Sequence, residues 1–138
     1  MTNKKPVHAP QTLFNTLNNQ LMVNGFTMAQ IADLVGQTPF YAYDKAAITK
    51  TVATLKQQLP SKIKLHYAIK ANPYVPLVHF MAPLVDGFDV ASKGEMLVAI
   101  QTSMPNNEVS FAGPGKTDQE LTSAIVAGVT LNIESPNE

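Results

Sequence analysis

Apolar and polar residues alternate in four short stretches of the chain after Pro60, and a helix-like pattern separates each from the next. The stretches begin near Lys64, Asp86, Glu108 and Val129, which are 22, 22 and 21 residues apart. Apolar residues at helical spacing fill the segments between them, at 75–81, 93–102 and 118–127. Strands that alternate with helices at this spacing predict βα units and a parallel sheet.

The two faces of each predicted strand differ in polarity. Alternate side chains of a strand point to opposite faces, so Phe88 and Val90 share one face and Asp89 lies on the other. The other three stretches divide in the same way, into an apolar face and a face of small or polar residues. A parallel sheet with helices on both sides is apolar on both. One polar face shared by four strands therefore predicts the inside of a (β/α) barrel that holds a polar ligand.

The N-terminal part of the chain is less regular. Residues 1–26 are rich in Asn and Gln, and we expect them to form an irregular arm. A helix is predicted from Thr27, which opens a T-x-x-Q capping box, and Gly36 suits the end of that helix. The aromatic run 40–43 predicts a strand, and Asp44 can cap the helix that follows it.

Length and composition limit the possible functions. The chain has 138 residues, of which 45% are hydrophobic, and this suits one core rather than two. We divide it into an arm with a helix (1–36) and the first half of a barrel domain (37–138). The formal net charge is zero, so no basic surface indicates nucleic acid. We expect no membrane span and a cytoplasmic location, because the start of the chain has no long apolar run.

Metal and cysteine chemistry have no support in the sequence. The chain has no cysteine, which excludes disulfides and thiolate ligands within it. Two of its three histidines, His8 and His79, have no carboxylate or histidine at ligand spacing, so we expect no metal site.

Lys70 is the main candidate for chemistry. It falls at the carboxyl end of the first predicted strand, on the polar face, which is the end where (β/α) barrels place their active sites. An unprotonated lysine amine can attack an aldehyde, whereas an unpaired buried charge is costly. Asp89, inward on the next strand, could orient Lys70 or balance its charge. The simpler alternative is a lysine that pairs with Asp89 and contributes only solubility.

Four segments together resemble one known family. They read YAIKAN at 67–72, GFDVASKGE at 87–95, FAGPGK at 111–116 and NIES at 132–135. In this order they resemble the ornithine/diaminopimelate/arginine decarboxylases, the fold-type III enzymes that depend on pyridoxal 5′-phosphate (PLP) and share the alanine racemase-like fold. The phrase GQTPFYAYD at 36–44 is most similar to diaminopimelate decarboxylase-like enzymes associated with bacterial exosortase systems.

The resemblance implies a cofactor and roles for particular residues. Lys70 would hold PLP as a Schiff base, and Asp89 would lie beside that lysine. His66 lies inward below Lys70, where it is either a packed histidine or a residue that contacts the cofactor. Glu95 either caps a helix or supports the site from behind. The family resemblance further implies decarboxylation of a small amino acid, in lysine biosynthesis or an exosortase-associated pathway, by a homodimer.

Four strands do not close an eight-stranded barrel, so we expect the chain to be the N-terminal portion of a longer protein. We expect this portion alone to fold poorly and to be inactive. Three alternatives stay open at this point: a non-catalytic PLP-binding protein of cofactor homeostasis, an amino-acid racemase of the same fold, and a structural α/β fragment without cofactor.

Overall fold

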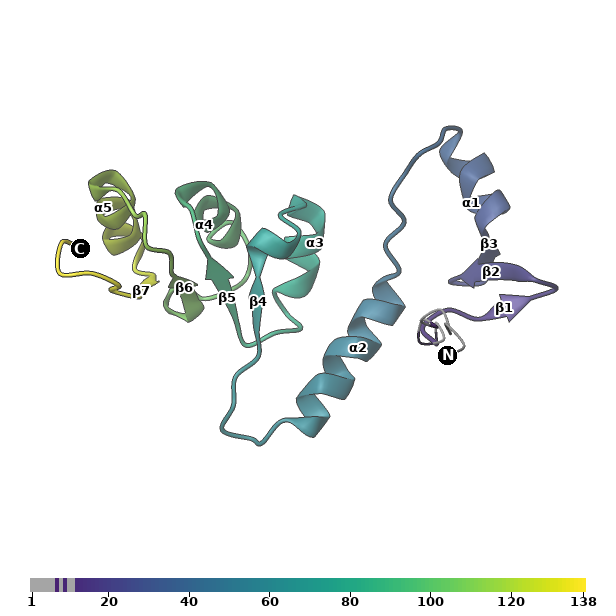
Figure 1. Cartoon of the computed structure of the whole chain (residues 1–138), viewed down its shortest axis with the longest axis horizontal. Coiled ribbons are helices and arrows are strands. Elements are labelled where there is room, and N and C mark those ends of the chain that lie inside the picture. Colours follow the sequence, from purple (N-terminus) through teal and green to yellow (C-terminus); the bar gives the residue numbers. More distant parts are fainter. Residues whose placement is uncertain (1–6, 8, 10–11) are drawn as a thin grey trace, which may run out of the picture. The chain divides into compact units, whose positions relative to one another are not determined.

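The computed structural model describes residues 7, 9 and 12–138 of the chain (Figure 1). They fall into two compact units, Met1–Thr51 and Val52–Glu138, and the division lies inside helix α2 (Lys45–Gln58). The predicted boundary between residues 36 and 37 stays a prediction. No helix in the described part of the chain is both long and apolar enough to cross a membrane.

The first unit contains a small antiparallel sheet where the sequence led us to expect an irregular arm. Its strands β1 (Thr16–Leu17), β2 (Gln20–Val23) and β3 (Phe26–Thr27) pair in the order β1-β2-β3. Two-residue turns join them: Asn18 and Asn19 have φ of 49° and 60°, and Asn24 and Gly25 have φ of 49° and 84°. Asn and Gly tolerate the left-handed region that such hairpin turns require. The prediction of an irregular arm was therefore wrong for residues 16–26, whereas residues 1–6, 8, 10 and 11 lie outside the described part of the chain.

Helices α1 and α2 begin as predicted. Helix α1 (Met28–Val35) has a complete capping box between Thr27 and Gln30, and it ends at Gly36 with φ of 76°. Helix α2 is capped by Asp44, whose carboxylate accepts a hydrogen bond from the Ala47 amide at 3.1 Å. Short polar side chains at these positions satisfy amide groups that the first helical turn leaves unpaired.

The predicted strand at residues 40–43 is not present. Residues 40–44 have no regular secondary structure, although they are rich in aromatic residues. A β-strand requires a hydrogen-bonded neighbour, and none of the described segments pairs with this one. High β-propensity was therefore not sufficient here.

The second unit consists of four βα-type strands in one parallel sheet, as predicted. The strands β4 (His66–Ala68), β5 (Gly87–Val90), β6 (Val109–Phe111) and β7 (Thr130–Leu131) are adjacent in chain order. Helices α3 (Val75–Met81), α4 (Lys93–Ala99) and α5 (Asp118–Ala127) connect them and lie on one side of the sheet in Figure 1. Short 3-10 turns η1 (Ile69–Ala71) and η2 (Asn106–Glu108) complete the unit. Consecutive parallel strands with helical crossovers are the repeating unit of a (β/α) barrel.

The core lies between the sheet and these helices. Four side chains from the middle strands are 0–1% exposed: Phe88, Val90, Val109 and Phe111. Helix residues Met96, Ala99 and Ala124 are also 0–1% exposed. The four buried strand residues are the apolar positions that strand alternation assigns to the helix side. The predicted division of the sheet into an apolar face and a polar face is therefore confirmed. The opposite face carries the small and polar residues of the strands, among them Asp89 and Ser110.

A charged cluster holds the amino end of β5 against the segment before β4. The Asp86 carboxylate accepts a hydrogen bond from the Leu65 amide at 2.8 Å and forms an ion pair with Lys56. The Leu65 amide, and after it the Lys56 ammonium, lower the pKa of Asp86 below its usual 3.8. Because the ionised form is the one bound, this cluster stabilises the fold only while Asp86 is charged.

We expect Asp86→Asn to reduce stability in a pH-dependent way. A carboxyl whose pKa is lowered by folding contributes stability above its unfolded pKa, and this contribution is lost as pH falls through the folded pKa. The difference in unfolding free energy between wild type and Asp86→Asn should therefore be largest above pH 3.8 and shrink on further acidification. Urea unfolding at a series of pH values measures this difference. A difference that stays constant across the series would contradict the assignment.

Candidate cofactor site at the carboxyl ends of the strands

Lys70 lies directly after β4, in the middle of the 3-10 turn η1. The sequence pattern had placed it on the strand itself, but the strand ends at Ala68. The next residue, Ile69, is 0% exposed and anchors the turn in the core, whereas Lys70 is exposed. The chain thus presents one free-standing amine at the carboxyl end of the first strand of the sheet.

The polar face of the sheet continues from this turn across the neighbouring strands. Ala68 is in register with Asp89, and Asp89 is in register with Ser110. The Ser110 hydroxyl accepts a hydrogen bond from the Asn132 side-chain amide at 3.0 Å. Asp89 is half-buried, and its neighbour in register, Ala68, has a small side chain. Small and polar residues therefore follow one another across the sheet next to the turn that carries Lys70.

Lys70 and Asp89 do not form an ion pair: none of the salt bridges among residues 12–138 joins them. The simple alternative of a lysine neutralised by Asp89 is not what the structure contains.

His66 lies against the backbone of the next strand. It is in register with Gly87, and a Cβ added to Gly87 would come within 2.5 Å of the His66 ring. Since that Cβ would point to the same face as Asp89, the ring lies on the polar face, as alternation predicted. The His66 ring can therefore occupy this position only because residue 87 has no side chain.

We expect Gly87→Ala to destabilise the protein by about 1–3 kcal/mol, the usual cost of overpacking. The added methyl would lie 2.5 Å from the Glu108 carbonyl oxygen, which is backbone and does not rotate away. Gly94→Ala is a matched control, because Gly94 lies in α4 with its nearest neighbour at 3.9 Å. That control should gain about 0.5–1 kcal/mol. Denaturant unfolding measures both, and equal effects of the two substitutions would contradict the packing of His66 on Gly87.

Carboxylates hold the loops at the carboxyl ends of β5 and β6. Glu95 accepts a hydrogen bond from the Ala91 amide at 2.9 Å. Glu120 accepts one from Lys93 and one from Thr117, both at 3.1 Å, and these amides lower its pKa. The predicted capping box at Thr117 is complete.

The predicted capping box at Ser92 is only half-formed. The Ser92 hydroxyl accepts from the Glu95 amide at 3.2 Å, but the Glu95 carboxylate turns to Ala91 instead of Ser92. Glu95 thus supports the end of β5, behind Asp89, through the main chain.

Lys116 lies in the loop after β6, but its side chain is buried. Its side chain is 1% exposed, donates to the Gly113 carbonyl at 2.6 Å and pairs with Glu138 at 3.1 Å. The Gly113 amide in turn donates to Glu134 at 2.7 Å. These bonds join the loop after β6 to the segment after β7, and no spacing rule in the sequence signals them.

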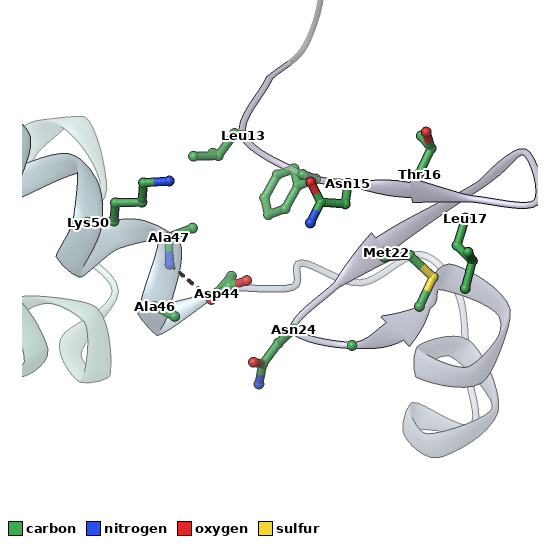
Figure 2. Close-up of a pocket in the computed structure, with 12 residues that line it drawn as sticks. Leu13, Asn15, Thr16, Leu17, Met22, Asn24, Asp44, Ala46, Ala47 and Lys50 are labelled. Atoms are coloured by element: carbon green, nitrogen blue, oxygen red, sulfur yellow. Dashed lines mark hydrogen bonds between the residues drawn. The ribbon is translucent and has the colours of Figure 1, made fainter.

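Three hollows of the described residues lie away from Lys70. One of them, with a volume of about 520 Å³, lies in the first unit between the hairpin and the start of α2. Figure 2 shows its lining, where Asp44 accepts a hydrogen bond from the Ala47 amide. None of His66, Lys70 and Asp89 lines it. No group of three or more metal-ligating side chains occurs among the residues that the structure describes, and His8 lies outside them.

The family of the chain follows from comparison with known proteins. The family model described as "Pyridoxal-dependent decarboxylase, pyridoxal binding domain" matches residues 45–138, more than half of the chain. The chain belongs to this family. The resemblance inferred from the four segments is thereby confirmed, together with PLP as the cofactor of the pyridoxal-dependent decarboxylases.

Individual pyridoxal-dependent decarboxylases match over most of this chain. A 2-[(L-alanin-3-ylcarbamoyl)methyl]-2-hydroxybutanedioate decarboxylase of Staphylococcus aureus is 36% identical over 71% of the chain and 24% of its own length. A diaminopimelate decarboxylase of Aquifex aeolicus is 31% identical over 88% of the chain and 29% of its length. The crystal structure of AQ1208 from Aquifex aeolicus matches with a TM-score of 0.79 and 30% identity, over 89% of this chain and 31% of that one. The chain spans about a quarter to a third of the length of these relatives.

The exposure and surroundings of Lys70 fit the attachment of PLP. The aldehyde of PLP reacts with a lysine amine that it can reach from solvent, and polar groups beside the amine can hold the cofactor. Lys70 is exposed on an anchored turn, Ala68 is small, and Asp89 carries a carboxylate without an ion-pair partner among the described residues. This part of the pyridoxal-binding domain is therefore suited to attach the cofactor.

Proposed function

We propose that the chain is the lysine-bearing portion of a PLP-dependent amino-acid decarboxylase, with PLP held as a Schiff base on Lys70. The observation that carries this proposal is the position of Lys70: an exposed amine on a turn anchored by buried Ile69, directly after β4. Carboxyl ends of strands are where barrel enzymes place their chemistry. Because the chain belongs to the pyridoxal-dependent decarboxylases, the cofactor that we propose for this amine is PLP.

Three side chains would act at this site. The Lys70 amine would attach the cofactor. Once the incoming substrate has displaced it from the cofactor, the same amine would exchange protons with the substrate. The half-buried Asp89, one strand away, offers a carboxylate that balances the positive charge of the attached lysine. The His66 ring, which lies against Gly87, would add a polar group to the same face of the sheet. When bound, PLP supplies an electron sink for the charge left on the α-carbon after carbon dioxide departs.

The substrate we propose is a small amino acid of the diaminopimelate type. The relatives that support this choice are those named diaminopimelate decarboxylase, such as the Aquifex aeolicus protein. Since these relatives are three to four times as long as the matched segment, we place the complete reaction in a protein that continues beyond these residues. A homodimer and a cytoplasmic location stay predictions from the family resemblance.

An assay of carbon dioxide release tests this function. The protein that carries these residues, at its natural length, is incubated with PLP and with diaminopimelate, ornithine or arginine in turn. We expect PLP-dependent carbon dioxide release, highest with diaminopimelate. Inversion of the α-carbon without carbon dioxide would instead identify a racemase. Binding of PLP with neither product would identify a cofactor-homeostasis protein, and either result would refute the decarboxylase proposal.

A further inference from the structure

The turn that carries Lys70 is closed from behind by a side chain with no role in the proposed chemistry. The Tyr67 hydroxyl donates a hydrogen bond to the Asn72 carbonyl oxygen at 3.0 Å. Tyr67 precedes the turn η1 (Ile69–Ala71) and Asn72 follows it, so this bond links the two ends of the segment in which Lys70 is central.

Asn72 is held at further atoms. Its amide donates to the Ile69 carbonyl at 3.0 Å, and its side-chain oxygen accepts from the Tyr74 amide at 3.1 Å. A three-residue 3-10 turn has weak internal hydrogen-bond geometry, so such outside bonds determine how well its conformation is fixed. The bond from Tyr67 ties the turn back to β4.

Tyr67 itself is fixed by the core. Its ring meets Phe88 edge to face, with centroids 6.3 Å apart and an interplanar angle of 69°. Phe88 is 0% exposed and belongs to the neighbouring strand β5. Strand alternation places Tyr67 on the helix side of the sheet, opposite to His66 and Ala68. The phenol thus reaches the turn from the packed side and leaves the polar face free.

We propose that Tyr67 is a positioning residue for Lys70, and this inference rests on the proposed role of Lys70 in attaching PLP. The Tyr67–Asn72 bond keeps the turn in the conformation that presents the Lys70 amine at the carboxyl end of β4. Without this bond the competent conformation is a smaller fraction of the folded population, and the apparent dissociation constant of PLP rises in inverse proportion to that fraction.

The test compares Tyr67→Phe with Tyr41→Phe in the protein at its natural length. Tyr67→Phe removes the bonding hydroxyl and keeps the ring on Phe88, whereas Tyr41→Phe removes a hydroxyl from a side chain that is 90% exposed. We expect Tyr67→Phe to raise the apparent dissociation constant of PLP about 5- to 10-fold, the effect of one neutral hydrogen bond. The control should leave it unchanged. Absorbance of attached PLP measures the affinity, and hydrogen exchange of the Asn72 amide in the cofactor-free protein reports on the turn.

The outcomes separate positioning from general stability. Weaker PLP binding together with faster Asn72 exchange in Tyr67→Phe supports the proposal. Faster exchange with unchanged PLP affinity of the folded protein would make Tyr67 merely structural and overturn it. Unchanged exchange would overturn it as well. The wild-type titration alone tests whether Lys70 attaches PLP, so failure of the proposed function is recognised separately from failure of this inference.

Discussion

Replacing Lys70 with arginine is expected to abolish PLP attachment and to lower PLP-dependent decarboxylation by roughly 10²–10⁴-fold, the contribution typical of one essential acid–base group. The guanidinium of arginine keeps the positive charge but stays protonated, so it does not attack an aldehyde. Lys70 is exposed and forms none of the ion pairs among residues 12–138, so the substitution should leave the fold intact. Absorbance of bound PLP and carbon dioxide release measure the two effects.

Lys62→Arg is the matched control for this substitution. Lys62 is also exposed and precedes β4, but it lies before the strand and not at its carboxyl end. We expect it to retain wild-type absorbance and activity. Equal losses in the two variants would show that general lysine chemistry, and not the position of Lys70, is responsible.

Replacing Phe88 with alanine is expected to lower the unfolding free energy by about 3–5 kcal/mol, as for other buried phenylalanines. Phe88 is 0% exposed at the centre of the parallel sheet, and its ring supports Tyr67 edge to face. The substitution therefore leaves a cavity and removes the support of the Lys70 turn at once. Denaturant unfolding measures the loss.

The control for Phe88→Ala is Ile125→Ala, which truncates an apolar side chain that is 68% exposed on α5. Surface substitutions of this kind change stability by less than about 0.5 kcal/mol. A loss for Phe88→Ala no larger than that of the control would contradict a core between the sheet and its helices.

The parallel sheet could be predicted because several local signals agreed along the chain. Apolar alternation located β5 and β6, and capping sequences located the starts of helices such as α5 at Asp118. The polar face was predicted for the same reason, since alternation alone assigns Asp89 and Phe88 to opposite sides. These features depend on neighbours in sequence.

Features that depend on distant partners were missed. The run 40–43 has strand composition but no paired neighbour among the described segments. The Lys116 ammonium is bound by the Gly113 carbonyl and by Glu138, which belongs to the segment after β7. The Tyr67–Asn72 bond at 3.0 Å likewise depends on where the chain turns after β4.

One missed feature had a usable local signal. The Asn-Asn and Asn-Gly pairs at 18–19 and 24–25 are two-residue hairpin turns, and Asn-Gly is among the strongest short-range hairpin signals. Between them lie the residues of β2, which include buried Val23. These two turn pairs, with the short segments on either side of them, indicate three paired strands rather than an irregular arm.

The most direct test of the central claim is a map of PLP attachment over all lysines. The chain has ten lysines and no arginine, so nine other amines compete with Lys70 as internal controls. The protein at its natural length is incubated with PLP and reduced with borohydride, and its peptides are analysed by mass. We expect stoichiometric modification at Lys70, with every other lysine at background, including the nine others of this chain. Modification spread evenly over exposed lysines, or concentrated at another one, would contradict it.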